Sequence, residues 1–292
     1  MKNFKNVSIV IPAYNEQNTI QSVLDTINDH IGSSIGELIV VNDCSVDNTK
    51  MILENLNIGN LVIINNLRNL GYGGSLKAGI KKAKKDFILM LDADGQHNVE
   101  HLKSLLDNDY EKYEAIIGSR SNANHSYIWR LPGKFIINRI SSFIAGRKIP
   151  DLNSGLRIVK KSILLKYIHL CPEGFSFSST ITMSLVCRNY NVLFHPITVF
   201  KRNQGKSRVK IKDGFNTILL LLRLSVTFSP FKIFVPISIT FFISGLMIGL
   251  PILFDGDGLS VGSLLLFISS MLSFSLGLLF DQISNIRIEK FE

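Results

Sequence analysis

Residues 87–97 read FILMLDADGQH, an unbroken apolar run followed directly by two carboxylates. The five apolar residues have the length and composition of a strand buried on both faces. Asp92 and Asp94 stand one residue apart where that strand ends, and in extended backbone this spacing points both side chains to the same side. Two interpretations remain open here: an acidic turn in solvent, or a site that holds a cation.

The spacing of this element excludes a calcium-binding EF-hand. That loop also begins with acidic residues at its first and third positions, but it requires glycine at the sixth and glutamate at the twelfth. Here glycine falls fourth, at Gly95, and the twelfth residue is Lys103. Carboxylate oxygens favour Mg²⁺ or Mn²⁺, and Mg²⁺ is usually completed by substrate phosphates and water. An acidic turn and a Mg²⁺ or Mn²⁺ site are therefore the remaining alternatives.

Similar apolar runs recur through the first half of the chain. They lie at residues 7–11, 37–41, 61–64 and 115–117, and helix-like segments at 16–31, 45–57 and 74–85 separate the early ones. This alternation predicts an α/β domain over residues 1–212, with a Rossmann-like, mostly parallel sheet covered by helices on both faces. Ligands of such sheets bind beyond the carboxyl ends of the strands.

The loops after the first two predicted strands concentrate polar residues at that edge. VSIVIPAYNE (7–16) ends its strand at Pro12 and offers Asn15 as a cap for the following helix. VNDCSVDNT (41–49) offers Ser45 or Asp47 as a cap, which leaves Asp43 to bind a nucleobase or a ribose hydroxyl.

A glycine-rich turn, NLGYGGSLKAGI (69–80), opens the third predicted helix. It does not match the dinucleotide fingerprint, because from Gly71 the next glycines fall at 73 and 74 and position 76 is leucine, and it lacks the spacing of a P-loop. The N–H groups at the start of a helix still attract phosphate.

The last third of the chain has a different composition. Ile233–Phe254 and Leu259–Phe280 are runs of 22 residues without a charge. At about 1.5 Å per residue each spans roughly 33 Å, enough to cross a bilayer core. The sequence therefore predicts two transmembrane helices within 231–282, preceded by an amphipathic interfacial helix over 213–230 and followed by a tail, 283–292.

The charge distribution indicates a membrane rather than nucleic acid as the partner. The net charge is +9, and the basic segment KRNQGKSRVKIK (201–212) lies just before the apolar third, as is typical of contact with anionic lipid headgroups. The loop between the apolar runs, DGDG, carries only acid, so the positive-inside rule predicts that the catalytic domain and both termini are cytoplasmic. Three scattered cysteines and a short N-terminal apolar run predict no disulfide framework, zinc site or secretion signal.

The four loops VSIVIPAYNE, VNDCSVDNT, NLGYGGSLKAGI and LDADGQH, in this order, resemble those of the GT-A glycosyltransferases of inverting family 2. The D-x-D element of that family holds a divalent cation on the donor diphosphate. The match extends through GSR (118–120), NRISSF (138–143), DLNSGLRIVKKS (151–162) and RNQGKSR (202–208). Together with the paired C-terminal helices, these segments resemble the polyprenyl-phosphate glycosyltransferases, relatives of dolichyl-phosphate mannose synthase. The resemblance covers essentially the whole chain.

The resemblance implies roles for individual residues. Those implied at the nucleotide sugar are Pro12, Ala13, Tyr14, Glu16, Asp43, Gly71, Lys77, Asp92, Ala93, Asp94, Arg202 and Lys206. The implied metal ligands are Asp92, Asp94 and Gln96, and the implied acceptor-phosphate residues are Arg120, Arg139 and Ser154. Asp94, Arg120 and Arg139 are the candidate catalytic residues. The alternatives are a surface ion pair for Arg120 and a solvated helix position for Arg139.

One departure from the family pattern bears on the acceptor. Many relatives keep an acidic residue near the helix that matches PEGFSFSSTITM (172–183), where it serves a hydroxyl acceptor, but this chain has no carboxylate between Glu173 and Asp213. A phosphomonoester needs no base, because its second pKa is about 6.

We therefore expect inverting transfer of one hexose-type sugar from a UDP- or GDP-linked donor to undecaprenyl or dolichyl phosphate. The alternatives are transfer to a glycolipid or polysaccharide hydroxyl, and a non-catalytic membrane-anchored nucleotide-sugar binder. Paired membrane helices are also compatible with a homo-oligomer.

Overall fold

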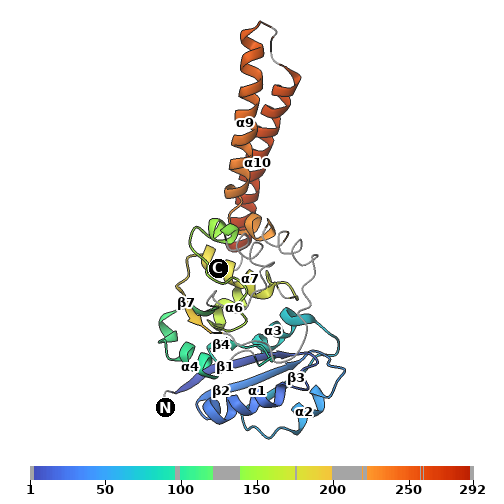
Figure 1. Cartoon of the computed structure of the whole chain (residues 1–292), viewed down its shortest axis with the longest axis vertical. Coiled ribbons are helices and arrows are strands. Elements are labelled where there is room, and N and C mark those ends of the chain that lie inside the picture. The colour runs from blue at the N-terminus through green and yellow to red at the C-terminus, as the bar shows by residue number, and fades with distance from the viewer. Residues whose placement is uncertain are drawn as a thin grey trace.

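A seven-stranded sheet organises the first two thirds of the chain, in the order β3-β2-β1-β4-β6-β5-β7 (Figure 1). The structure, a computed structural model, describes residues 3–95, 99–120, 139–174, 176–198, 219, 222–256, 258 and 260–289. The strands are β1 Phe4–Ala13, β2 Ile35–Asn42, β3 Leu61–Asn65, β4 Phe87–Met90, β5 Ala115–Arg120, β6 Arg157–Lys160 and β7 Val192–Ile197.

The strand directions explain why distant segments meet at one edge. β1 is parallel to β2 and β4, β2 is parallel to β3, and β5 is parallel to β7. β6 is antiparallel to both β4 and β5, so these two run in the same direction. β1 to β5 therefore all end at one edge of the sheet, while β6 begins there. The predicted mostly parallel α/β fold is confirmed.

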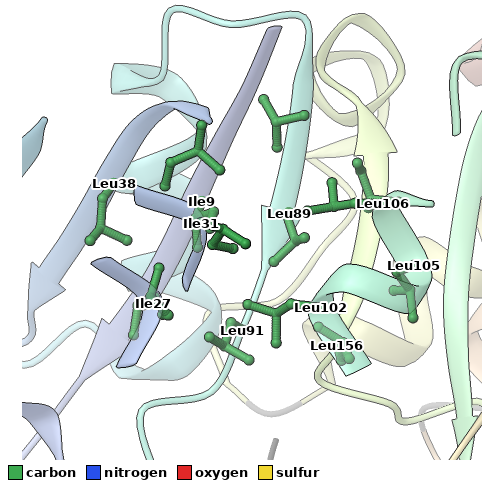
Figure 2. Close-up of a cluster of buried hydrophobic side chains, with 14 of the residues drawn as sticks. Ile9, Ile27, Ile31, Leu38, Leu89, Leu91, Leu102, Leu105, Leu106 and Leu156 are labelled. Carbon is green, nitrogen blue, oxygen red and sulfur yellow. The ribbon is translucent and has the colours of Figure 1, made fainter. Parts of the chain in front are cut away.

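Helices cover both faces of the sheet because the strands are apolar on both sides. The helices and helical turns are α1 Ile20–Ile27, a π turn Asn28–Gly32, α2 Thr49–Asn55, α3 Gly71–Lys82, α4 Val99–Leu106, a 3-10 turn Tyr110–Lys112, α6 Lys161–Tyr167 and α7 Phe177–Cys187. Figure 2 shows Ile9, Leu38 and Leu89 of the sheet beside Ile27 of α1 and Leu102 of α4. The alternate strand residues, such as Val10, pack on the opposite face with α3, α6 and α7.

Pro12 lies within β1, which continues to Ala13, whereas the sequence placed the end of the strand at the proline. Ala13 O accepts a hydrogen bond from Asp43 N, so the backbone of Ala13 faces β2 and that of Pro12 faces the opposite side. On that side β4 pairs only as far as Val10. The missing N–H of Pro12 therefore removes no hydrogen bond from the sheet.

Two long apolar helices form an antiparallel pair that projects from the α/β domain (Figure 1). They are α9 Phe231–Phe254 and α10 Val261–Glu289, and both are long and apolar enough to cross a membrane. α10 continues past the predicted end of the span at 282, so the expected tail is helical as far as Glu289. The helices pack through small residues, and Ser238 and Ser270 each donate a hydrogen bond to the backbone O of the other, both at 2.9 Å.

The segment between domain and hairpin packs onto the domain. Residues 222–228 of the predicted interfacial helix are helical. Leu224 is buried in a cluster that includes Ile144 and Met183, while Leu222 stays exposed. The position of this helix at a membrane surface stays a prediction.

Candidate active site

The carboxyl edge of the sheet brings together side chains from five segments. Asp92 and Asp94 follow β4, Arg120 ends β5, and Arg157 opens β6. The Tyr72 hydroxyl of α3 and the backbone O of Ser178 in α7 approach from the helix layer and contact Asp92 and Arg157, respectively. The result is a polar, charged cluster at the edge where this class of sheet binds its ligands.

Asp92 is held from two sides. The Tyr72 hydroxyl donates to Asp92 Oδ1 at 2.9 Å. On the other side the backbone of Gly155 approaches so closely that a Cβ at this position would clash with Asp92 Oδ2. Burial, together with the neighbouring Asp92 carboxylate, raises the pKa of Tyr72 well above its usual value, so the phenol keeps its proton and acts as the donor.

Arg120 forms a two-point ion pair with Asp151. Arg120 Nε lies 2.6 Å from Asp151 Oδ2, and Nη2 lies 2.9 Å from Oδ1. The Asp151 side chain is 2% exposed and that of Arg120 is 39% exposed, so this is not the solvated surface pair considered from the sequence. Hydrogen bonding to Asp151 raises the pKa of Arg120. Nη1 takes no part in this two-point ion pair.

Asp43 is engaged with the protein itself. Its side chain is 3% exposed and accepts hydrogen bonds from the backbone N–H groups of Leu70 and Gly71 and from Asn66 Nδ2, each at 2.8 Å. These bonds fasten the start of α3, where Gly71 has a φ of +78°. A carboxylate that already accepts three hydrogen bonds has little capacity left for a ligand. Binding of the nucleotide sugar by Asp43, as the resemblance implies, therefore stays a prediction.

The loops after β1 and β2 bind each other. Asn15, at φ 56°, donates its N–H to Ser45 Oγ at 3.1 Å, and its Oδ1 accepts from Val46 N at 2.9 Å. The expectation that Asn15 caps a helix is wrong, because α1 begins after Thr19. Ser45 is likewise not a cap, and the Asp47 carboxylate accepts hydrogen bonds from the N–H groups of Gln17 and of Thr49, the first residue of α2. Asparagine tolerates a left-handed backbone conformation, so Asn15 determines the course of the loop after β1.

The other residues that the resemblance implies for binding the nucleotide sugar also lie near this edge. Pro12 and Ala13 end β1, Tyr14 is 43% exposed, and Glu16 Oε2 accepts from Thr19 Oγ1 at 2.7 Å. Lys77 is half-buried on α3, and Ala93 is buried between the two aspartates.

The residues implied for the acceptor phosphate come from three segments: Arg120 ends β5, Arg139 lies on a helical segment, and Ser154 precedes β6. Ser154 is buried and its Oγ donates to Leu156 O at 3.3 Å, so the hydroxyl is already engaged. Arg139 is exposed on the helical segment 139–145, beside a cavity of about 530 Å³ that Ile140, Ser142 and Phe143 also line. Gln96, Arg202 and Lys206 lie outside the described residues.

Arg157 is 1% exposed, and its role was not predictable from the sequence. Its guanidinium donates to Ser178 O at 2.8 Å, to Thr182 Oγ1 at 3.1 Å and to Ser154 O. The available signal was a single basic residue at the head of an apolar run, RIVK (157–160). Tyr72 and Asp151 were missed as well, because their partners lie 20 and 31 residues away in the chain.

The carboxylates at this edge suit a divalent cation whose remaining ligands come from a bound substrate. Within the described residues there is no cluster of three His, Cys, Asp or Glu side chains that could hold a metal. Mg²⁺ is usually bound by one or two carboxylates and completed by phosphate oxygens and water. Asp92 and Asp94 supply that number of carboxylates at the edge of the sheet.

Known proteins share both parts of this architecture. Residues 8–168, more than half of the chain, match the family described as glycosyl transferase family 2, and residues 229–286 match the GtrB C-terminal hairpin. Glycosyltransferase AglJ of Haloferax volcanii is 28% identical over 230 residues, which cover 77% of this chain and 73% of AglJ. Undecaprenyl-phosphate 4-deoxy-4-formamido-L-arabinose transferase of Yersinia pestis is 28% identical over 234 residues, 78% of this chain and 70% of that protein.

Solved structures share the fold. Glucosyl-3-phosphoglycerate synthase from Mycobacterium tuberculosis, crystallised with Mn²⁺, uridine diphosphate and phosphoglyceric acid, superposes with a TM-score of 0.59 at 16% identity, covering 75% of this chain and 78% of that one. TarS from S. aureus gives 0.51 at 20% identity, covering 77% and 65%.

A mixed sheet of this order with an acidic D-x-D element at its carboxyl edge defines a GT-A glycosyltransferase. The chain belongs to glycosyltransferase family 2, and its last two helices form the GtrB-type hairpin. The resemblance stated from the sequence is confirmed. The protein is an enzyme, and the alternative of a non-catalytic nucleotide-sugar binder is excluded.

Proposed function

We propose that the enzyme transfers a single hexose-type sugar from a UDP- or GDP-linked donor to a polyprenyl phosphate, of the undecaprenyl or dolichyl type, at the cytoplasmic face of a membrane. Relatives at 28% identity that include an undecaprenyl-phosphate sugar transferase support this acceptor class. The acidic DGDG loop and the flanking cations support the orientation.

The observation that carries the proposal is the junction between the Arg139 helix and the hairpin. Lys232, the second residue of α9, donates from Nζ to Phe143 O at 3.2 Å and to Ile144 O at 2.6 Å. Arg139 lies one turn earlier in the same helical segment as Phe143. An exposed cation is thereby tied to the start of an apolar span, which suits an acceptor phosphate whose hydrocarbon tail remains in the bilayer.

At the nucleotide-sugar site, the residues must bind the diphosphate and stabilise it as the leaving group. Asp92 and Asp94 would hold a divalent cation, which when bound stabilises negative charge on the leaving diphosphate. Arg202 and Lys206 would add positive charge over the same phosphates. The anomeric C–O bond breaks with its electron pair remaining on the nucleoside diphosphate.

On the acceptor side, an oxygen of the lipid phosphate attacks the anomeric carbon from the opposite face and inverts it. The start of α7 presents Ser178, and the chain has no carboxylate between Glu173 and Asp213 to act as a base. A phosphomonoester is already ionised near pH 7 and needs none. Arg120 and Arg139 would hold this second anion close to the first.

The test uses membranes that contain the protein, labelled UDP- and GDP-sugars, polyprenyl phosphate and Mg²⁺ or Mn²⁺. We expect a lipid-linked labelled product that mild acid releases and that EDTA abolishes. Asp94→Asn should lose the product, whereas Asp25→Asn, the same change at an exposed position on α1, should keep it. Undiminished product from Asp94→Asn would contradict the proposal.

A further inference from the structure

Arg157 places a buried positive charge directly behind the acidic element. It pairs with Met90, the last residue of β4, in the β4–β6 register, and Met90 precedes Asp92 by two residues. No carboxylate of the described residues forms a salt bridge with its guanidinium, whose hydrogen bonds go to neutral oxygens of Ser154, Ser178 and Thr182. Its Nε has no hydrogen-bond partner among the described residues.

Such a charge is costly if its only role is structural. A buried ion without a counter-ion costs several kcal/mol, and arginine cannot lose its proton to avoid that cost. The groups that act on it electrostatically are Tyr72, Asp151, Asp92 and Cys171, and the two carboxylates among them lie at the carboxyl edge. The charge is therefore directed at the site that is expected to bind a diphosphate and a cation.

Tyr72 and Gly155 complete the surroundings of Asp92. The Tyr72 hydroxyl fixes Oδ1, and the bare backbone of Gly155 lies against Oδ2. Partners that hydrogen-bond a metal-binding carboxylate set its orientation, and losing one typically costs about 10- to 100-fold in metal affinity or activity.

We propose that Tyr72 and Arg157 are positioning residues for the donor site. Tyr72 holds the Asp92 carboxylate in the orientation that receives the cation. Arg157 supplies a fixed positive charge on the protein side of Asp92 that favours the donor diphosphate. The inference rests on the proposed nucleotide-sugar donor.

The two residues are expected to act on different ligands. Removing the Tyr72 hydroxyl lets the carboxylate turn, so the affinity for the cation falls. Removing the charge of Arg157 weakens attraction for a diphosphate anion, but it also removes a repulsion acting on the cation. A merely structural role would instead weaken both ligands together.

The first test measures Mn²⁺ binding to the full-length protein in detergent by electron paramagnetic resonance, with and without UDP or GDP. Tyr72→Phe should weaken Mn²⁺ about 10-fold in the presence of the nucleotide. The control is Tyr167→Phe, which removes the same oxygen from a buried tyrosine on α6 whose hydroxyl lies 3.3 Å from that of Tyr190. Equal Mn²⁺ affinity in the two variants would overturn the role of Tyr72.

The second test compares Arg157→Met with Arg157→Lys, which keeps the charge. Arg157→Met should weaken UDP or GDP about 10-fold while leaving Mn²⁺ alone bound as tightly or more tightly, and Arg157→Lys should restore part of the nucleotide affinity. Equal losses of nucleotide and Mn²⁺ in Arg157→Met would overturn the role of Arg157. These measurements need no lipid acceptor. Failure of the variants to shift binding is therefore distinct from failure of the unaltered enzyme to make the lipid-linked product.

Discussion

Replacing Asp43 with asparagine separates a structural role from a donor-binding role. The Asp43 carboxylate accepts three hydrogen bonds of 2.8 Å, two of them from the backbone N–H groups of Leu70 and Gly71. An asparagine of the same shape has one acceptor oxygen, so its amide NH₂ must face one of the three donors. At least one hydrogen bond to a charged group is lost and one buried donor is left unsatisfied.

These losses set the expected magnitude. A hydrogen bond to a charged group contributes about 1.5–3 kcal/mol, and an unsatisfied buried donor costs about 1–3 kcal/mol. We expect Asp43→Asn to lower the free energy of unfolding by about 3 kcal/mol. In a domain of this size that corresponds to a fall in the unfolding temperature of about 6–12 °C.

Thermal unfolding of the full-length protein by circular dichroism measures this change, with Asp25→Asn as the control. Affinity for UDP or GDP with Mn²⁺, measured below the transition, completes the comparison. An Asp43→Asn protein as stable as the unaltered one, but unable to bind the nucleotide, would refute the reasoning. That result would show that Asp43 contacts the donor directly, as the resemblance implies.

Four further predictions concern the buried thiols, Lys232 and the serine pair of the hairpin. Burial raises the thiol pKa of Cys171 to about 12 and that of Cys187 to about 11, so neither should react with Ellman's reagent in the folded protein near pH 8. Because both folded pKa values exceed the ordinary 9.0, the two protonated thiols should contribute fully to stability below about pH 9. That contribution should be lost as the pH rises through about 11 for Cys187 and about 12 for Cys171, measurable as a falling unfolding temperature. Lys232→Met should reduce transfer to the lipid but leave nucleotide binding intact, and parallel losses of both would contradict the junction. Ser238→Ala and Ser270→Ala should each lower the free energy of unfolding in detergent by about 0.6 kcal/mol, because each removes one hydrogen bond to the backbone O of the other residue, and unchanged stability in both variants would contradict these bonds.

The sequence revealed the strands whose burial leaves a local signature. FILML is apolar at every position, and VSIVI at every position except Ser8, because both faces of β1 and β4 are covered. β6 has four residues and begins with a buried arginine, and β7 contains His195 and Pro196, so neither resembles a buried strand. α7 is buried almost all round and therefore lacks the one-sided pattern of an amphipathic helix.

The acidic element was visible for the same reason, because its two carboxylates directly follow an apolar run. The partners of these residues were not visible. Arg120 meets Asp151, and Arg157 approaches Asp92, only because β6 inserts antiparallel between β4 and β5. That register is set by contacts between segments far apart in the chain. Local spacing therefore located the acidic edge but not the ion pair or the buried charge behind it.

The identity of the acceptor is the central claim, and one comparison tests it directly. Purified enzyme, its nucleotide-sugar donor and Mg²⁺ or Mn²⁺ are supplied with polyprenyl phosphate or with the polyprenol of equal chain length, and products are identified by mass spectrometry. We expect a glycosylated lipid from the phosphate and none from the alcohol, because Arg120 and Arg139 would bind a second anion and no carboxylate that could deprotonate a hydroxyl lies between Glu173 and Asp213. A product from the polyprenol at a comparable rate would contradict it.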